Sequence, residues 1–261
     1  MPELPEAERA RQQLERVLGR QIVAVDDSDT YVCRPHAPGE MAAALVGHRL
    51  VATHRRGKFL WVETDGGPDL GLHLGMAGRI AVDEAEAPRA WDRFSVEFAD
   101  GGRMALRDKR RLGRAVLAPD FSHVGPDAAE VDRDTFRLRF GRSGAPLKAR
   151  LLDQGVVAGV GNLLADEILW RARMHPQRPA NDLTVDELDA LRRAMRAAMR
   201  DAIRLGGAHT GHLNPHRVRG GRCPRCGTEL SRATVGARTT FWCPACQGPW
   251  PAAAGYGAAP R

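Results

Sequence analysis

The chain opens with MPELPEAER, a stretch that carries a proline at position 2 and a glutamate at position 3. Removal of an initiator methionine before proline leaves Pro2 as a free secondary amine. An α-amino group titrates at about 8, so a useful neutral fraction is available at physiological pH. Such an amine can attack an aldehyde-like carbon to form an iminium, with Glu3 beside it to carry protons. On this segment alone, an extended lead-in to a helix that starts at Pro5 is the simpler interpretation.

Lysine is scarce in this chain: of the 39 basic residues, only Lys58, Lys109 and Lys148 are lysines. An ammonium is a compact point charge whose pKa can be tuned, whereas a guanidinium stays protonated and presents several donors in one plane. Lys58 follows Gly57 at the start of the apolar run FLWVE. It is either a solvated charge at a strand edge or a cation that reaches a phosphate or tunes the nearby amine. The scarcity of lysine favours the functional interpretation.

Four cations fall within six residues of the stretch DKRRLGRAV, at Lys109, Arg110, Arg111 and Arg114. This density predicts contact with phosphates or bases. Leu112 lies inside the run as an exposed apolar candidate, and apolar wedges beside arginines are able to open a base stack. In LHLGMAGRI, His73 and Met76 flank a glycine-punctuated turn, which also fits a core strand that simply ends in a turn.

The stretch LKARLLDQGVVAGVGNLLADEILWRARMHP predicts a helix, a glycine-rich turn and a second helix. Its glycines allow a tight turn with exposed backbone amides, and Asn162 is expected to cap the second helix. The start of that helix would accommodate an anion such as a phosphate. Basic residues flank the turn at Lys148, Arg150, Arg171 and Arg173. Phosphate binding and mere turn geometry remain equally open on these residues.

The cysteines are unevenly distributed along the chain. Two CxxC pairs, CPRC and CPAC, lie close together near the C-terminus and comprise Cys223, Cys226, Cys243 and Cys246. This spacing predicts one structural zinc ion, in preference to two disulfides or a redox pair. The arginines around the two CxxC pairs favour contact with a nucleic-acid backbone over recognition of bases. Cys33 stands alone and is interpreted as an ordinary small side chain.

Composition narrows the class of protein. The formal net charge is +7 and the sequence pI is about 9.7, which favours a polyanionic partner. The chain has no run of eighteen apolar residues, so no membrane span is expected. The acidic opening differs from the basic and apolar opening of an export signal, so we expect a cytoplasmic protein.

Periodicity predicts the main elements. A helix is expected over residues 5–18, and a long helix over residues 184–206, with Thr184 and Glu187 as a capping box and Gly206 as terminator. The strand pattern indicates a two-sheet sandwich or barrel. The expected strands lie at residues 21–27, 48–56, 58–64, 69–76, 78–84, 94–100, 103–109 and 113–119.

Six motifs in sequence order resemble the formamidopyrimidine-DNA glycosylase and endonuclease VIII family of base-excision repair enzymes. They are PELPE, GKFL, HLGMAG, DKRRLG, the glycine-rich hairpin and the CPRC/CPAC pair. The opening PELPE is closer to the formamidopyrimidine branch. The resemblance implies a monomer that grips damaged double-stranded DNA and flips the damaged nucleotide out of the stack.

The resemblance also implies an α+β multidomain fold. It comprises an N-terminal β-sandwich with a leading helix over residues 1–120 and a linker over 121–134. A helix-two-turn-helix domain over 135–216, a zinc ribbon over 217–250 and a disordered tail over 251–261 follow.

The resemblance implies a role for each residue that matches a family motif. Pro2 would be the nucleophile at C1′, which expels the base and then nicks the strand by elimination, and Glu3 would be the proton shuttle. Lys58 matches the family's strand lysine. DNA contacts are implied for Met76, Arg110, Leu112, Lys148, Asn162 and Arg238. The first three fill the gap left by the flipped base, Lys148 lies near the lesion, and the last two hold phosphates.

Two departures from the family pattern bear on the substrate. The purine-specific members show Asp-Pro-Arg-Arg-Phe-Gly, whereas this chain has DKRRLG, with Leu112 in place of the aromatic residue. The segment GGAHTGHLNPHRVRGGRC is shorter than the loop that covers an oxidised purine. We therefore expect stronger activity on abasic or ring-opened substrates than on 8-oxoguanine.

Two other classes of protein fit part of the pattern. A zinc-containing reader of damaged DNA that does not cut leaves the Pro2–Glu3 start unexplained. An RNA-binding or ribosome-binding zinc-ribbon protein explains the charge but not the glycine-rich hairpin.

Overall fold

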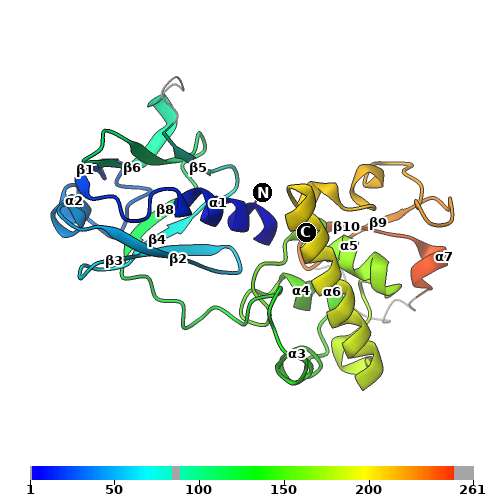
Figure 1. Ribbon diagram of the computed structural model, residues 1–261. Coiled ribbons are helices and arrows are strands. Elements are labelled where there is room, and N and C mark those ends of the chain that lie inside the picture. The colour runs from blue at the N-terminus through cyan, green and yellow to red at the C-terminus, as the bar shows by residue number, and fades with distance from the viewer. Residues whose placement is uncertain (1, 84–88, 250–261) are drawn as a thin grey trace, which may run out of the picture.

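The computed structural model describes residues 2–83 and 89–249. The tail predicted over 251–261 lies outside these residues. Figure 1 shows a β-rich half and a helical half with the N-terminus between them. Within the described residues, no helix is both long enough and apolar enough to cross a bilayer.

Two antiparallel four-stranded sheets form the β-rich half. The first has the order β1 (Ile22–Asp26), β6 (Asp92–Phe98), β7 (Arg103–Arg107) and β5 (Arg79–Val82). The second has the order β2 (Leu50–Arg56), β3 (Phe59–Thr64), β4 (Leu70–His73) and β8 (Arg114–Leu117). Their inward side chains form one apolar core, to which the short helix α2 (Glu40–Leu45) adds Met41 and Leu45. All eight strands predicted from alternation are therefore present, in the sandwich arrangement.

Helix α1 (Leu4–Glu15) joins the two halves of the molecule. Its first buried residue, Leu4, belongs to the core of the helical half. One turn later, Ala7, Ala10 and Leu14 belong to the core of the sandwich. The N-terminus of the chain is therefore fixed at the boundary between the two cores.

The helical half follows the order expected from periodicity. It contains α3 (Arg133–Phe140), α4 (Leu147–Leu152), α5 (Asn162–Ala172) and α6 (Val185–Leu205), with the 3₁₀ turns η2 (Ala180–Asp182), η3 (Ala208–Thr210) and η4 (Asn214–His216). Thr184 and Glu187 form the predicted capping box, and Gly206 ends α6 with a φ of 100°. The zinc ribbon pairs β9 (Ser231–Val235) with β10 (Arg238–Trp242), followed by α7 (Pro244–Gln247).

The segment expected to be a linker is tied to both halves. Asp127 is buried and accepts the Gly57 amide at 2.7 Å and the Ala129 amide at 2.8 Å. Its carboxylate also pairs with Arg55 of β2. Helix α3 begins at Arg133, inside the last residues of the predicted linker. The connection therefore contributes to the fixed geometry of the site.

Candidate active site and nucleic-acid interface

The carboxylate of Glu3 lies at the N-terminus of α5. Only 1% of Glu3 is exposed. Its two oxygens accept the amides of Gly161 at 2.9 Å, Leu163 at 2.8 Å and Leu164 at 3.1 Å. These amides have no intrahelical partner, and the helix dipole favours a negative charge there. The anion at this helix start is therefore the protein's own Glu3.

This arrangement corrects one sequence-based expectation. Asn162 is the first residue of α5, and Gly161 occupies the N-cap position without a side chain. The capping role predicted for Asn162 was wrong, because Glu3 supplies the acceptor oxygens from the other end of the chain. The Asn162 side-chain oxygen is buried and has no hydrogen-bond partner. Its side chain is half-buried at the edge of the Glu3 site.

Two glycines of the hairpin make room for the N-terminal segment. A Cβ at Gly161 would lie 2.3 Å from Cδ of Glu3, and one at Gly159 would lie 2.5 Å from Cδ1 of Leu4. Gly159 also has a φ of 112° and accepts the Leu4 amide at 3.0 Å. The glycine-rich turn is thus the socket into which the first residues of the chain fit.

Glu6 fixes the peptide that follows Pro2, a role that the sequence did not reveal. Its Oε2 accepts the Glu3 amide at 2.9 Å, and its Oε1 accepts the Ala208 amide at 2.7 Å. The second contact reaches the segment after α6. Glu6 therefore connects the start of the chain to the segment that follows α6.

Lys58 reaches the same site from the turn between β2 and β3. Gly57 has a φ of 62°, and a Cβ there would lie 2.6 Å from Cβ of Ala158 in the hairpin. Burial lowers the pKa of Lys58, the nearby Glu3 carboxylate opposes this shift, and the Arg238 charge adds to it. Burial also raises the pKa of Glu3, against the opposing effect of its amide hydrogen bonds and of Lys58. Lys58 is therefore coupled electrostatically both to Glu3 and to Arg238.

A cavity of about 430 Å³ opens beside Pro2, between α1 and β5. Its lining residues include Pro2, Glu6, Arg9, Leu74, Arg79 and Ile80. The lining thus places a carboxylate, two guanidinium groups and aliphatic side chains next to Pro2.

Met76 and Leu112 lie on two turns that pack against each other. A Cβ at Gly75 would lie 2.4 Å from the carbonyl carbon of Leu112, so the two backbones touch. Met76 is 42% exposed and Leu112 is 37% exposed, which leaves both side chains available as wedges. Arg110, on the same turn as Leu112, is also exposed. The structure thus brings together the three residues expected to fill the gap left by a flipped base.

The turn that carries Arg110 and Leu112 is organised by Asp108. Its buried carboxylate accepts the amides of Arg110 at 2.9 Å, Leu112 at 2.7 Å and Gly113 at 2.8 Å. Asp108 was not identified from the sequence. An aspartate that begins a loop and accepts the amide two residues later is the available signal.

Lys148 requires a correction. The resemblance implies a DNA contact near the lesion, but Lys148 is fully buried and lies 2.7 Å from Asp166 of α5. Its ammonium also donates to the Thr239 carbonyl of β10 at 3.0 Å. Asp166 in turn accepts Arg217 at 2.9 Å and the Phe241 amide at 3.1 Å. Lys148 therefore fastens the zinc hairpin to α5 and has no surface left for DNA.

Arg238 is the first residue of β10 and is exposed at the tip of the zinc hairpin. The turn before it contains Gly236 and Ala237, with φ values of 58° and 57°. Lys148 donates to the carbonyl of Thr239, the residue after Arg238, and Asp166 accepts the Phe241 amide of the same strand. Arg238 therefore lies next to a fixed support, and its charge acts on Lys58. An exposed guanidinium of this kind suits a phosphate.

The four cysteines of the ribbon fit a zinc ion. Their sulfur atoms all lie within 4.8 Å of one another, and Cys226 lies 3.5 Å from Cys243. A tetrahedral zinc with bonds of about 2.3 Å separates its sulfur ligands by about 3.8 Å. The Trp170 indole of α5 donates to the Cys223 sulfur at 3.3 Å, a contact that suits a thiolate. The predicted structural zinc site is confirmed, whereas Cys33 is buried in the sandwich core, where burial raises its pKa to about 12.

Comparison with known families covers most of the chain. Residues 1–115 match the formamidopyrimidine-DNA glycosylase N-terminal domain, and residues 123–213 match the H2TH domain of the same family. Residues 220–248 match the zinc finger found in FPG and IleRS. The formamidopyrimidine-DNA glycosylase of Roseiflexus sp. is 39% identical in an alignment of 274 positions, gaps included, which covers 95% of this chain and 100% of that protein.

Solved structures agree with this result. A complex of a Lactococcus lactis FPG variant with Fapy-dG-containing DNA superposes with a TM-score of 0.83 at 29% identity, over 94% of this chain and 99% of that one. A complex of the Lactococcus lactis protein with DNA containing an abasic site also gives 0.83 at 29% identity, over 95% and 100%. On this evidence of sequence and fold together, the chain belongs to the formamidopyrimidine-DNA glycosylase family.

Proposed function

We propose that the protein excises oxidised or ring-opened bases from duplex DNA and then nicks the abasic strand. The observation that carries this proposal is the fixed placement of Pro2. Glu6 binds the amide that follows Pro2, and Pro2 itself lines the cavity next to α1. A free secondary amine in this position faces a space large enough for a nucleoside.

Chemistry at C1′ follows from the groups around Pro2. The amine attacks C1′, the bond from C1′ to the base breaks, and the base leaves with a proton. The bond from C1′ to the ring oxygen then breaks, the ring oxygen takes a proton, and an iminium forms between Pro2 and C1′. This electron sink allows a proton to leave C2′ and the bond from C3′ to the 3′ phosphate to break. Glu3 is the proton shuttle, because it is the residue next to the amine and burial raises its pKa, which favours uptake of a proton during the reaction.

Two cations and one side-chain amide would hold the backbone of the damaged strand. Lys58 and Arg238 are close enough to affect each other electrostatically, so an anion between them relieves repulsion. Asn162 lies at the start of α5, and its side-chain NH2 group would donate to a phosphate oxygen. A phosphate bound among these residues would bring the adjacent sugar to Pro2. Met76, Arg110 and Leu112 would occupy the space left in the duplex.

We infer the preferred lesion from the segment between α6 and Cys223, the first cysteine of the zinc ribbon. This segment contains only the short turns η3 and η4, and Ala208 within it is tied to Glu6. A short, tethered segment covers less of an extruded base than a long loop would. We therefore propose abasic and ring-opened substrates ahead of 8-oxoguanine. The Lactococcus lactis complexes with Fapy-dG-containing and abasic DNA support this substrate class.

Borohydride trapping tests the proposal. The mature protein is incubated with duplex DNA that contains an abasic site, reduced, and resolved by denaturing electrophoresis. A covalent adduct that is absent from Pro2→Gly and from a form that retains methionine supports the proposal. Binding of damaged DNA without any adduct would instead favour a reader that does not cut. The bacterial relatives and the DNA substrate support a place of action in the cytoplasm, at the nucleoid.

A further inference from the structure

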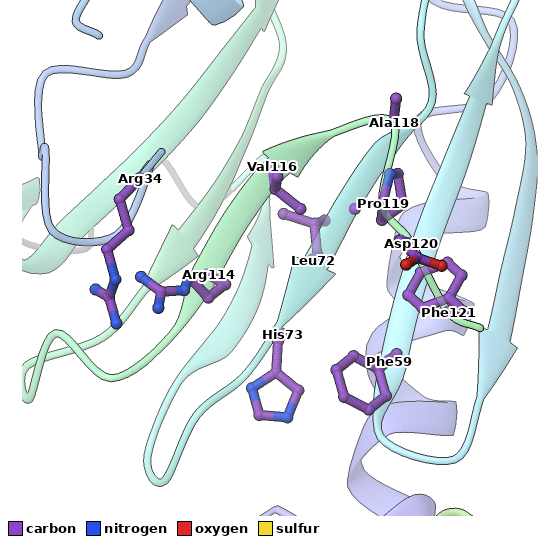
Figure 2. A pocket seen from close by; sticks show the side chains of 11 residues that line it. Arg34, Phe59, Leu72, His73, Arg114, Val116, Ala118, Pro119, Asp120 and Phe121 are labelled. Atoms are coloured by element: carbon purple, nitrogen blue, oxygen red, sulfur yellow. The ribbon is translucent and has the colours of Figure 1, made fainter. Parts of the chain in front are cut away.

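A second cavity, of about 300 Å³, lies on the outer face of the sheet formed by β2, β3, β4 and β8. Figure 2 shows Arg34 and Arg114 at one end, with their guanidinium groups next to each other, and Phe59 and Phe121 at the other. His73 lies between the two ends. The cavity thus has a cationic end and an aromatic end.

The two guanidinium groups converge without an acidic partner. Nη1 of Arg114 donates to the Tyr31 carbonyl at 2.8 Å, and Nη1 of Arg34 donates to the same carbonyl oxygen. Among the described residues, neither arginine forms an ion pair. By contrast, Arg111 and Arg93, which are close by, both pair with Asp29. Two like charges brought to one oxygen repel each other, and an anion between them would remove that repulsion.

Other charged groups facing the pair do not supply that anion. Asp120 lines the far end of the cavity beside Phe121, and it is bound to Ser122 at 2.8 Å. Burial, followed by the charge of Arg34, lowers the pKa of Arg114. Burial also lowers the pKa of His73 to about 4, so His73 is neutral at physiological pH. His73 Nδ1 accepts the Gly75 amide at 3.1 Å, which leaves the proton on Nε2 as a hydrogen-bond donor.

The pair is aligned with the catalytic site across the sheet. Phe59 of β3 is directly opposite His73 of β4, which is directly opposite Arg114 of β8. Residues paired in this way lie on one face, and neighbouring strands are about 4.8 Å apart, so β3 and β8 are separated by about 10 Å. Lys58 immediately precedes Phe59. One DNA strand carries a phosphate per about 3.4 Å of helix axis, so about 10 Å is enough for the two ends to contact different phosphates.

We propose that Arg34 and Arg114 form an additional phosphate site, which holds a backbone phosphate of the DNA strand beyond the one bound near Lys58. The site deepens the proposed function and rests on it. The aromatic end excludes water from one side of the phosphate and strengthens the ionic contact. The same chemistry could also take a free phosphate or nucleotide, which the experiment must distinguish.

The first arm measures DNA affinity against salt. Arg34→Gln, Arg114→Gln and the double variant are titrated with a duplex carrying an uncleavable abasic analogue. Each phosphate contact contributes about 0.9 to the slope of log K against log salt. When the salt concentration is raised fourfold, a variant that lacks one contact should therefore lose about 3.5-fold less affinity than the wild type. We expect this smaller salt effect in the double variant and retention of the slope in Arg114→Lys.

The matched control is Arg133→Gln, which removes one exposed charge at the start of α3, in the other half of the molecule. It should leave the slope unchanged. An equal slope in the wild type and the double variant would overturn the proposal. A double variant that still forms the borohydride adduct but shows no change in slope would refute this site alone and leave the proposed function intact.

The second arm uses the wild-type protein and so does not depend on the folding of a variant. Single phosphates on either side of the lesion are replaced, one at a time, by neutral methylphosphonates. We expect one position, distinct from the phosphate next to the lesion, where neutralisation weakens the wild type but not the double variant. Absence of any such position contradicts the proposal. Inorganic phosphate provides the alternative outcome. If it binds the DNA-free wild type but not the double variant, and no such DNA position exists, the site takes a free anion and the proposal is contradicted.

Discussion

Glu3 and Gly161 are 158 residues apart in the chain, and Glu3 Oε2 accepts the Gly161 amide at 2.9 Å. This contact makes the second helix of the hairpin the support for the N-terminal amine. Leu4 adds a backbone bond to Gly159 in the same turn. The nucleophile proposed here is therefore held by a rigid helix start, although chain termini are commonly loose.

Gly161→Ala tests whether this support is required. A Cβ at this position would lie 2.3 Å from Cδ of Glu3, so the carboxylate must move. We expect a loss of about 1–3 kcal/mol in the free energy of unfolding and a larger loss in adduct formation. Chemical denaturation and borohydride trapping measure the two effects. Gly144→Ala is the control, since a Cβ there would meet its nearest atom at 3.9 Å. Full trapping by Gly161→Ala would contradict the account.

Glu3→Gln tests proton transfer. The amide keeps the size of the side chain but cannot carry the proton, so base excision should slow by about 10²–10⁴-fold. Affinity for a duplex with an uncleavable abasic analogue should change little, because Glu3 is buried against α5. Single-turnover kinetics and fluorescence anisotropy give the two quantities. Excision by Glu3→Gln at the wild-type rate would remove Glu3 from the mechanism.

The pH dependence of excision has two expected limbs. Burial raises the pKa of Glu3, so the proton needed for the leaving base is lost as the pH rises through that raised value. At low pH the amine of Pro2 becomes protonated and stops acting as a nucleophile. The rate should therefore pass through a maximum, and the alkaline limb should disappear in Glu3→Gln. An unchanged alkaline limb in that variant would assign it to another group.

Lys148→Met separates a structural role from DNA contact. Removal of the ammonium leaves Asp166 buried next to Arg217 alone, and breaking a buried pair costs about 3–5 kcal/mol. We expect this loss in thermal or chemical unfolding, with recovery of part of it in the double variant Lys148→Met, Asp166→Leu. A direct DNA contact would instead lower the salt slope of binding by about 0.9 at unchanged stability.

Zinc removal should act through the same connection. The ribbon is held to α5 by Trp170 and by the Asp166 contacts, and it carries Arg238. Chelation should release one zinc per chain and weaken DNA binding, because small zinc ribbons do not stay folded without metal. A chromogenic indicator measures the released zinc, and fluorescence anisotropy measures DNA binding. Zinc-loaded Arg238→Gln is the comparison for the loss of the arginine alone. Unchanged DNA affinity after zinc loss would show that the ribbon has no part in binding.

Local patterns accounted for most of the fold. Alternation gave the strands of the sandwich, the Thr184–Glu187 pair marked the start of α6, and the spacing of the cysteines indicated zinc. Each of these signals arises from residues that are neighbours in the chain. For Lys148, the family resemblance implied a DNA contact, and no local pattern indicates that a lysine is buried.

Contacts between distant segments account for the parts that the sequence did not reveal. The acceptor for the α5 amides comes from Glu3, and the partner of Lys148 comes from Asp166, on a different helix. Asp127, in the segment interpreted as a linker, is buried because Arg55 and Gly57 converge on it. In all three cases an acidic residue is paired across the fold, and periodicity carries no information about such pairs.

The most direct test of the central claim is to identify the atom that holds the sugar in the reduced adduct. The trapped protein is digested and its peptides are sequenced by mass spectrometry. We expect the reduced deoxyribose remnant on the nitrogen of Pro2, in the peptide PELPEAER with no methionine before it. A remnant on Lys58, or on any other lysine, would contradict the claim that the N-terminal amine is the nucleophile.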